Sequence, residues 1–123
     1  MPSIGPSADT MRKLSDKVSA RNLAVSVGVP VMPATEPLPR DPAEVARLAG
    51  EIGYPLMLKA SWGGGGRGMR VIRDEQGLLH DIDAARREAK AAFGKDDVYL
   101  EKLVERARHV EVQILADRHG SIV

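Results

Sequence analysis

The sequence predicts an α+β fold, in which a small antiparallel or mixed sheet has helices packed on one face. The main observation is the order of the patterns along the chain: helix, helix, then strand, loop, strand, helix, strand and strand. The composition agrees, because 43% of the 123 residues are hydrophobic and 28% are charged, which is typical of one soluble domain with its own core.

The helices are predicted from apolar spacing and from the residues that cap them. A short helix is expected from Ser7 to Leu14, and a second helix over 15–27, which Gly28 ends. The third helix spans 41–52, with Asp41 as N-cap and Pro42 at the first helical position. A fourth helix spans 75–93 before Gly94. Its predicted buried stripe consists of Leu78, Ile82, Ala85 and Ala89, and its predicted wet face of Arg86, Arg87, Glu88 and Lys90.

The strands are predicted from alternating apolar residues and from the turns between them. They are expected over 55–60, 69–73, 98–104 and 109–116, and another strand begins at 121. In the segment 109–116, Val110, Val112 and Ile114 share one face. The stretch 29–40 contains four prolines and is interpreted as an extended entry and a linker at a subdomain boundary.

The composition also excludes several functions. The net charge of +1 and the aromatic content of 3% argue against nucleic-acid binding, which uses basic faces and stacking side chains. The chain has no cysteine, so disulfides, zinc–thiolate sites and cysteine nucleophiles are ruled out. No apolar run is long enough to cross a membrane and no signal peptide is visible at residues 1–10, so a cytoplasmic location is expected.

The stretch from Lys59 to Arg70 contains four consecutive glycines at 63–66 and a further glycine at 68. Bare backbone flanked by cations favours an anionic ligand such as phosphate, and a flexible surface loop is the alternative. A Rossmann loop would open a helix, and a Walker A loop would need Gly-Lys-Ser/Thr, which is absent. A loop between two strands instead suggests a lid over phosphates, as in protein kinases.

The residues Lys59 to Val71 resemble the glycine-rich lid of biotin carboxylases, which are members of the ATP-grasp superfamily. The resemblance extends over residues 4–123 and includes the segments 4–6, 16–20, 28–30, 52–55, 87–93, 99–102 and 108–111. Among biotin-dependent enzymes, the segments 61–66 and 103–111 are most similar to the pyruvate carboxylase family.

The resemblance assigns roles to individual residues. Lys17 and Lys59 match the two lysines that contact ATP phosphates, and Gly65 and Gly66 match lid residues whose amides close on them. His109 matches a histidine that contacts ribose. The strand that contacts adenine, partly through main-chain groups, corresponds to Glu101, Lys102, Leu103 and Val104. Taken alone, Lys17, the pair Glu101–Lys102 and His109 would be interpreted as ordinary surface residues. Trp62 is expected to anchor the base of the loop.

The resemblance also implies an organisation. Residues 1–29 would lead into the ATP-grasp domain, 30–104 would form its lid subdomain, and 105–123 would begin the following core. The implied cofactors are ATP, Mg²⁺ with ligands outside this chain, and biotin. The implied partners are bicarbonate and a biotin carrier domain, within a homo-oligomer that carboxylates pyruvate. The alternatives are a biotin carboxylase subunit of an acetyl- or propionyl-CoA carboxylase, or a truncated non-catalytic module. The chain by itself is expected to be inactive in carboxylation.

Overall fold

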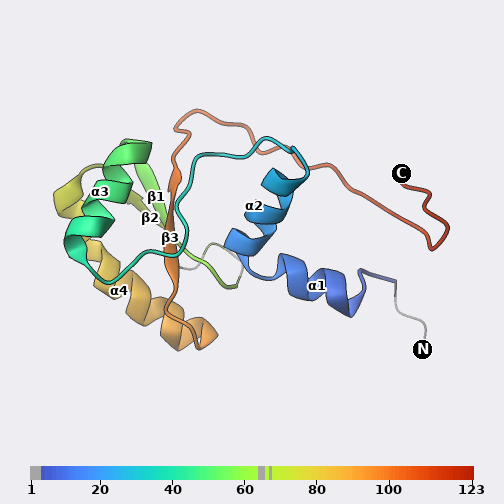
Figure 1. Ribbon diagram of the computed structural model, residues 1–123, viewed down its shortest axis with the longest axis horizontal. Helices are drawn as coiled ribbons and strands as arrows, with labels where there is room; N and C mark the ends of the chain where they lie inside the picture. Colours follow the sequence, from blue (N-terminus) through green and yellow to red (C-terminus); the bar gives the residue numbers. More distant parts are fainter. Residues whose placement is uncertain (1–3, 64–65, 67) are drawn as a thin grey trace.

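The computed structural model describes residues 4–63, 66 and 68–123, and Figure 1 shows their arrangement. The elements follow one another as α1 (Ala8–Leu14), α2 (Lys17–Ser26), α3 (Pro42–Ile52), β1 (Leu56–Ala60), β2 (Arg70–Ile72), α4 (Glu75–Phe93) and β3 (Val98–Lys102). Each predicted helix is present, and its ends lie within two residues of the predicted ones.

The three strands form one antiparallel sheet in the order β2-β1-β3, which confirms the predicted α+β fold. β1 is central, and its Leu58 lies opposite Arg70 of β2 and Leu100 of β3. Leu56, Leu58 and Ala60 alternate with half-buried residues, so that one face of β1 is buried as predicted. Helices α3 and α4 cover that face and close the hydrophobic core (Figure 1).

Short-range capping explains where the helices begin and end. The Asp41 carboxylate accepts a hydrogen bond from the Ala43 amide, and Pro42 occupies the first turn of α3. Asp16 caps α2 in the same way, through the amide of Ser19. Gly94 ends α4 with a φ of 76°, a left-handed conformation that glycine adopts without strain. These local signals are readable in the sequence, which is why the helix bounds could be predicted.

The proline-rich stretch before α3 lies along the outer edge of β3. The amides of Thr35 and Leu38 donate to the carbonyls of Leu100 and Val98, both at 2.8 Å, and the Lys102 amide donates to Pro33 at 2.8 Å. Because prolines interrupt the pattern of donors, the stretch is irregular and only a single bridge, Ala34 to Glu101, is formed. The segment thereby covers a strand edge that would otherwise remain open.

The structure corrects the prediction for Arg86, which was placed on the wet face of α4. Its side chain is buried, and Nη2 donates to the carbonyls of Leu38, at 3.2 Å, and Pro39. The guanidinium therefore ties α4 to the edge segment. An arginine can be buried in this way because its guanidinium donors reach carbonyl acceptors.

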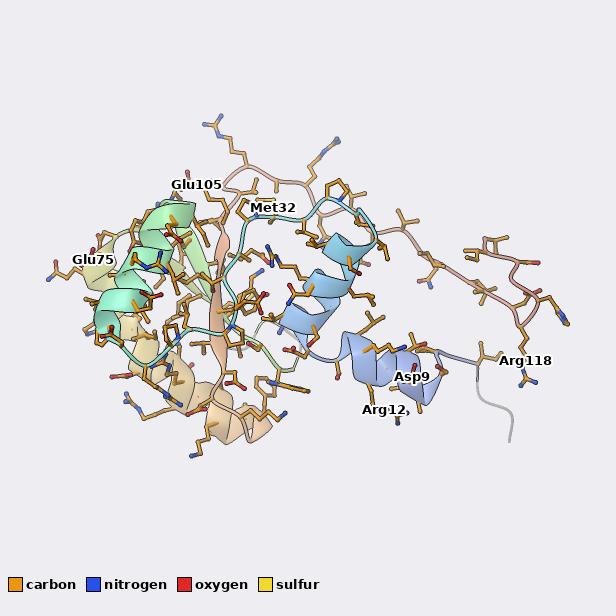
Figure 2. All side chains as sticks on the ribbon, in the orientation of Figure 1. Asp9, Arg12, Met32, Glu75, Glu105 and Arg118 are labelled. Atoms are coloured by element: carbon orange, nitrogen blue, oxygen red, sulfur yellow. The ribbon has the colours of Figure 1, made fainter. Side chains whose placement is uncertain are left out.

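The structure also corrects the predicted strand over 109–116. Within the described residues, this stretch belongs to no sheet, and only the bridge from Ala116 to Ile122 is formed. Alternation favours a strand only where a second strand can accept its hydrogen bonds, and none lies beside it here. Figure 1 shows the segment leaving the sheet and passing α2. Figure 2 shows its side chains, between the labelled Glu105 and Arg118, standing away from the helices and sheet.

Candidate functional site

The side chain of Lys17 lies at the base of the glycine-rich loop. Its Nζ donates to the carbonyl oxygens of Ala60, at 3.1 Å, and Gly63, at 2.7 Å. The Lys17 amide also donates to the Ser61 carbonyl at 2.9 Å. The backbones of the neighbouring Asp16 and of Trp62 form an isolated antiparallel β-bridge. The start of α2 is therefore fixed against the end of β1. An ammonium group carries three hydrogens, and these two carbonyls use two of them.

Lys59 lies close by, on the face of β1 opposite the core. Its ammonium forms an ion pair with the carboxylate of Glu101 on β3, and both side chains are about three-quarters buried, with 21% and 24% exposed. In the strand register Lys59 lies opposite Tyr99, and Glu101 lies opposite Met57, so the pair is diagonal across the two strands.

The two lysines share one electrostatic environment, although they are distant in sequence. Burial lowers the pKa of Lys17, and the positive charge of Lys59 lowers it further. The carboxylates of Asp16 and Glu101 act in the opposite direction. On the same face, burial raises the pKa of Tyr99 to about 12, and Glu101 adds to the effect. Two cations held this close together form a site where an anion is favoured.

The first residues of the loop are packed against the end of α4. Gly63 has a φ of 84°, and a β-carbon at this position would overlap the ring of Phe93. The ammonium of Lys95 lies 3.4 Å from the centre of the Trp62 ring, which is a cation–π contact. The structure thus places Trp62 at the base of the loop, as expected for an anchor.

The end of the loop is held from the same helix. Gly66 and Gly68 have positive φ angles of 72° and 73°. Arg70 then donates two hydrogen bonds, of 3.1 and 2.7 Å, to the carboxylate of Glu88 on α4. Gly64, Gly65 and Arg67 lie outside the described residues, so the role predicted for Gly65 stays a prediction. Gly66 is described, and it lies between the two held ends.

The segment predicted to contact adenine begins inside β3 with Glu101 and Lys102 and ends just after it with Leu103 and Val104. The Lys102 ammonium donates to the carbonyls of Gly53, at 2.7 Å, and Tyr54, at 3.0 Å. The Leu103 amide donates to the Pro55 carbonyl at 3.2 Å. These bonds tie the segment to the turn between α3 and β1. Val104 is 49% exposed at its end.

The structure does not bring His109 to the two lysines. Its ring lies in the exposed segment after β3, where Nε2 is 2.8 Å from the Glu111 carboxylate. Among the described residues, no hydrogen bond or ion pair joins His109 to the site. The predicted ribose contact therefore stays a prediction.

Sequence reasoning missed several residues that shape the site. Asp16 caps α2 through one carboxylate oxygen, and its other oxygen is buried without a partner. Phe93 and Lys95 hold the start of the loop. The signal available for Asp16 was its position before a helix, whereas the roles of Phe93 and Lys95 depend on a tertiary contact.

Two negative findings concern the described part of the chain. It contains no group of three or more histidine, aspartate or glutamate side chains that could hold a metal ion. None of its helices is long and apolar enough to span a membrane.

Comparisons with known proteins agree with this geometry. A solved structure of Rhizobium etli pyruvate carboxylase with the allosteric activator acetyl coenzyme A is 72% identical to the chain, with a TM-score of 0.87. It matches 97% of this chain and 10% of that one. The biotin carboxylase domain dimer of Hydrogenobacter thermophilus 2-oxoglutarate carboxylase, in complex with MgADP, ADP and bicarbonate, is 42% identical with a TM-score of 0.77. The match covers 82% of this chain and 22% of that one.

The fold and the comparisons define the chain as an ATP-grasp protein, related to biotin carboxylases. Residues 16–123 match the family described as carbamoyl-phosphate synthase L chain, ATP binding domain, and the chain belongs to that family. The biotin carboxylase of Haemophilus influenzae is 51% identical over 121 residues, which are 98% of this chain. The chain spans 27% of the length of that relative.

Proposed function

We propose that the chain binds the phosphates of ATP at the cluster of Lys17, Lys59 and the glycine-rich loop. Glu101, Lys102, Leu103 and Val104 would contact adenine, and His109 would contact ribose. The loop amides of Gly65 and Gly66 would complete the phosphate site. The chain would thus be the nucleotide-binding part of a biotin-dependent carboxylase.

One observation carries this proposal: the ammonium of Lys17 holds both ends of the loop's first turn, at Ala60 and Gly63, beside the second lysine, Lys59. A structural role alone would account for Lys17. The second ammonium adds support, because Lys59 is three-quarters buried and close enough that its charge lowers the pKa of Lys17. Glu101 already pairs with Lys59, but each ammonium carries three hydrogens, so the two lysines can also donate to a further anion. A phosphate chain would supply several negative charges at this point.

The parent enzyme is proposed to be a pyruvate carboxylase, on the strength of the 72% identity to the Rhizobium protein. ATP and bicarbonate would be used there to carboxylate biotin on a carrier domain, and the carboxyl group would pass to pyruvate. Mg²⁺ would be held by residues outside this chain. A homo-oligomer is proposed because a related domain is described as a dimer. The lack of cysteine fits a cytoplasmic protein.

A biotin carboxylase subunit of an acetyl- or propionyl-CoA carboxylase is the second candidate. The 51% identity to the Haemophilus biotin carboxylase favours it. In either parent, residues 1–29, 30–104 and 105–123 would form the entry helices, the lid subdomain and the start of the core. The third candidate is a module that folds without binding nucleotide. The chain by itself is predicted to be inactive in carboxylation, and an assay of bicarbonate-dependent ATPase activity would test this prediction.

The proposal is tested by titrating ATP into the 123-residue chain by isothermal calorimetry. Lys17→Ala and Lys59→Ala should each weaken binding about 10- to 100-fold, because each removes a charge-assisted hydrogen bond to phosphate. Lys13→Ala is the matched control, since Lys13 is an exposed lysine on α1 that pairs with Asp9. It should bind ATP as the unmodified chain does.

Two results would contradict the proposal. If the unmodified chain binds no ATP, the third candidate, a module without nucleotide binding, is correct. If it binds ATP and neither Lys17→Ala nor Lys59→Ala changes the affinity, the phosphates lie elsewhere.

A further inference from the structure

We propose that Glu101 is a resident counter-ion of Lys59, so that a phosphate group binds to this lysine only in competition with a carboxylate of the protein. The consequence is that Glu101 weakens the binding of phosphate groups at Lys59. This inference rests on the proposed function of Lys59 and adds a role for the side chain of Glu101, distinct from its main-chain contact.

The first step of the argument is the position of the pair. Lys59 and Glu101 point to the same side of the sheet, away from the core, because they occupy the alternate positions of β1 and β3 that α3 and α4 do not cover. Among the described residues, the Lys59 ammonium forms a single ion pair, which is with Glu101. An anion that binds Lys59 therefore lies close to this carboxylate.

The second step is the balance of charge around the pair. The lysines at 17 and 59 contribute two positive charges, and Asp16 and Glu101 contribute two negative ones. Arg21 adds a further positive charge near Tyr99 on the same face. Asp16 already has a structural role, since one of its carboxylate oxygens caps α2 by accepting hydrogen bonds from the amide and the hydroxyl of Ser19. Within the described part of the chain, Glu101 accepts no comparable hydrogen bond from the backbone, so it is the carboxylate that can be released.

The third step concerns what happens when phosphate arrives. Lys17 keeps its two bonds to Ala60 and Gly63 and has a hydrogen to offer. Lys59 donates one of its three ammonium hydrogens to Glu101, so a phosphate oxygen that binds this ammonium competes with the carboxylate for its charge and lies beside a like charge. Because the side chains are only about one-quarter exposed, solvent screens this repulsion incompletely. Removing the charge of Glu101 should therefore tighten anion binding.

The opposite role is also possible for a carboxylate in this position. If Glu101 served to orient the Lys59 ammonium toward its ligand, removing the carboxylate would weaken binding. The two roles predict opposite signs, which makes the substitution Glu101→Gln decisive. Glutamine has nearly the same size and keeps the backbone of β3 intact.

The experiment measures the affinity of the 123-residue chain for inorganic tripolyphosphate, inorganic phosphate and adenosine by calorimetry. We expect Glu101→Gln to bind tripolyphosphate and phosphate each about 5-fold more tightly, because both anions lose the same neighbouring negative charge. Adenosine carries no phosphate and tests the adenine contact proposed for Glu101, so a change confined to adenosine would overturn the counter-ion role.

Two control variants isolate the effect. Glu105→Gln removes one negative charge from an exposed glutamate that pairs with Arg73, and it should change each affinity less than 2-fold. Glu101→Asp keeps the negative charge and should therefore not show the tighter phosphate binding expected of Glu101→Gln. If Glu101→Gln fails to fold, as judged by circular dichroism, Glu101→Thr provides the same neutral test with a residue that favours strands.

The outcomes separate this inference from the proposed function. If Lys59→Ala leaves tripolyphosphate binding unchanged, the proposed phosphate site itself is wrong. If Lys59→Ala weakens binding but Glu101→Gln leaves it unchanged or weaker, the site is retained and the counter-ion role is overturned. In the background of Lys59→Ala, the gain from Glu101→Gln should be lost. A gain that persists there would also overturn the inference.

Discussion

At the scale of single residues, Gly63 shows how closely the base of the loop is determined. Its φ of 84° lies in the region where side chains are strained, and its α-carbon faces the ring of Phe93. Its carbonyl accepts the hydrogen bond from Lys17. Three elements, α2, β1 and α4, therefore meet at a residue that has no side chain. A glycine is required here by a turn and by a close approach at once.

We expect Gly63→Ala to lower the free energy of unfolding by about 1–3 kcal/mol, because it adds backbone strain and an overlap with Phe93. Urea denaturation followed by circular dichroism measures this. The control is Gly50→Ala in α3, where a β-carbon would meet no atom within 4 Å. That change should raise the stability by about 0.5–1 kcal/mol, since alanine favours helices. Equal stability of the two variants would show that Gly63 is not constrained.

At the scale of elements, the longest helix is held to the sheet edge by a buried cation. Arg86 of α4 donates to the carbonyls of Leu38 and Pro39, and the segment 33–38 in turn covers β3. The helix, the edge segment and the strand thereby form one unit. The bond matters because carbonyls left without a partner in a buried place cost free energy.

Arg86→Ala should therefore destabilise the chain by about 2–3 kcal/mol, from two lost hydrogen bonds and lost packing of the side-chain stem. Arg87→Ala is the matched control, since Arg87 is the next residue of α4 and is exposed. Its effect should be within about 0.5 kcal/mol. Thermal unfolding of both variants at one pH measures the difference. Similar losses for both would mean that Arg86 contributes only its helix propensity.

These two examples indicate how far the sequence could be used to predict the structure. Helix ends followed from local chemistry, such as Asp41 before Pro42, and the buried face of β1 followed from alternation. Arg86 could not be placed, because its acceptors come from a distant segment. The proximity of Lys17 and Lys59 was predicted through family resemblance alone, since each lysine by itself has the pattern of a surface residue. Alternation at 109–116 could not show whether a partner strand was present.

At the scale of the whole molecule, two parts of the chain are unlike each other. One is the body formed by the sheet, α3 and α4, in which the core residues are almost completely buried. The other is the segment after β3, in which Val110, Val112 and Ile114 are 63–82% exposed. Within the described residues, no backbone hydrogen bond is donated by an amide of 105–114. The two parts should therefore differ in how readily they open.

Hydrogen exchange measured by nuclear magnetic resonance or mass spectrometry checks this difference. We expect the amides of β1 and β3 to be protected and those of 105–114 to exchange at nearly the rates of an unfolded peptide. The Leu115 amide donates to the Val123 carbonyl at 2.8 Å, and the Val123 amide donates to the Leu115 carbonyl at 2.9 Å. The exchange rates of these two amides should be intermediate. Protection over 109–114 comparable to that of β1 would show that this segment pairs as a strand after all.

The contact between Trp62 and Lys95 has a practical consequence. Trp62 is the only tryptophan of the chain, and it lies next to Gly63 with an ammonium group over its ring. A charge so close to an indole shifts its emission, so the fluorescence of the unmodified chain comes from the very place where the loop is attached. The molecule thus carries its own optical probe of the loop base, and the proposed nucleotide binding can be tested there without a label.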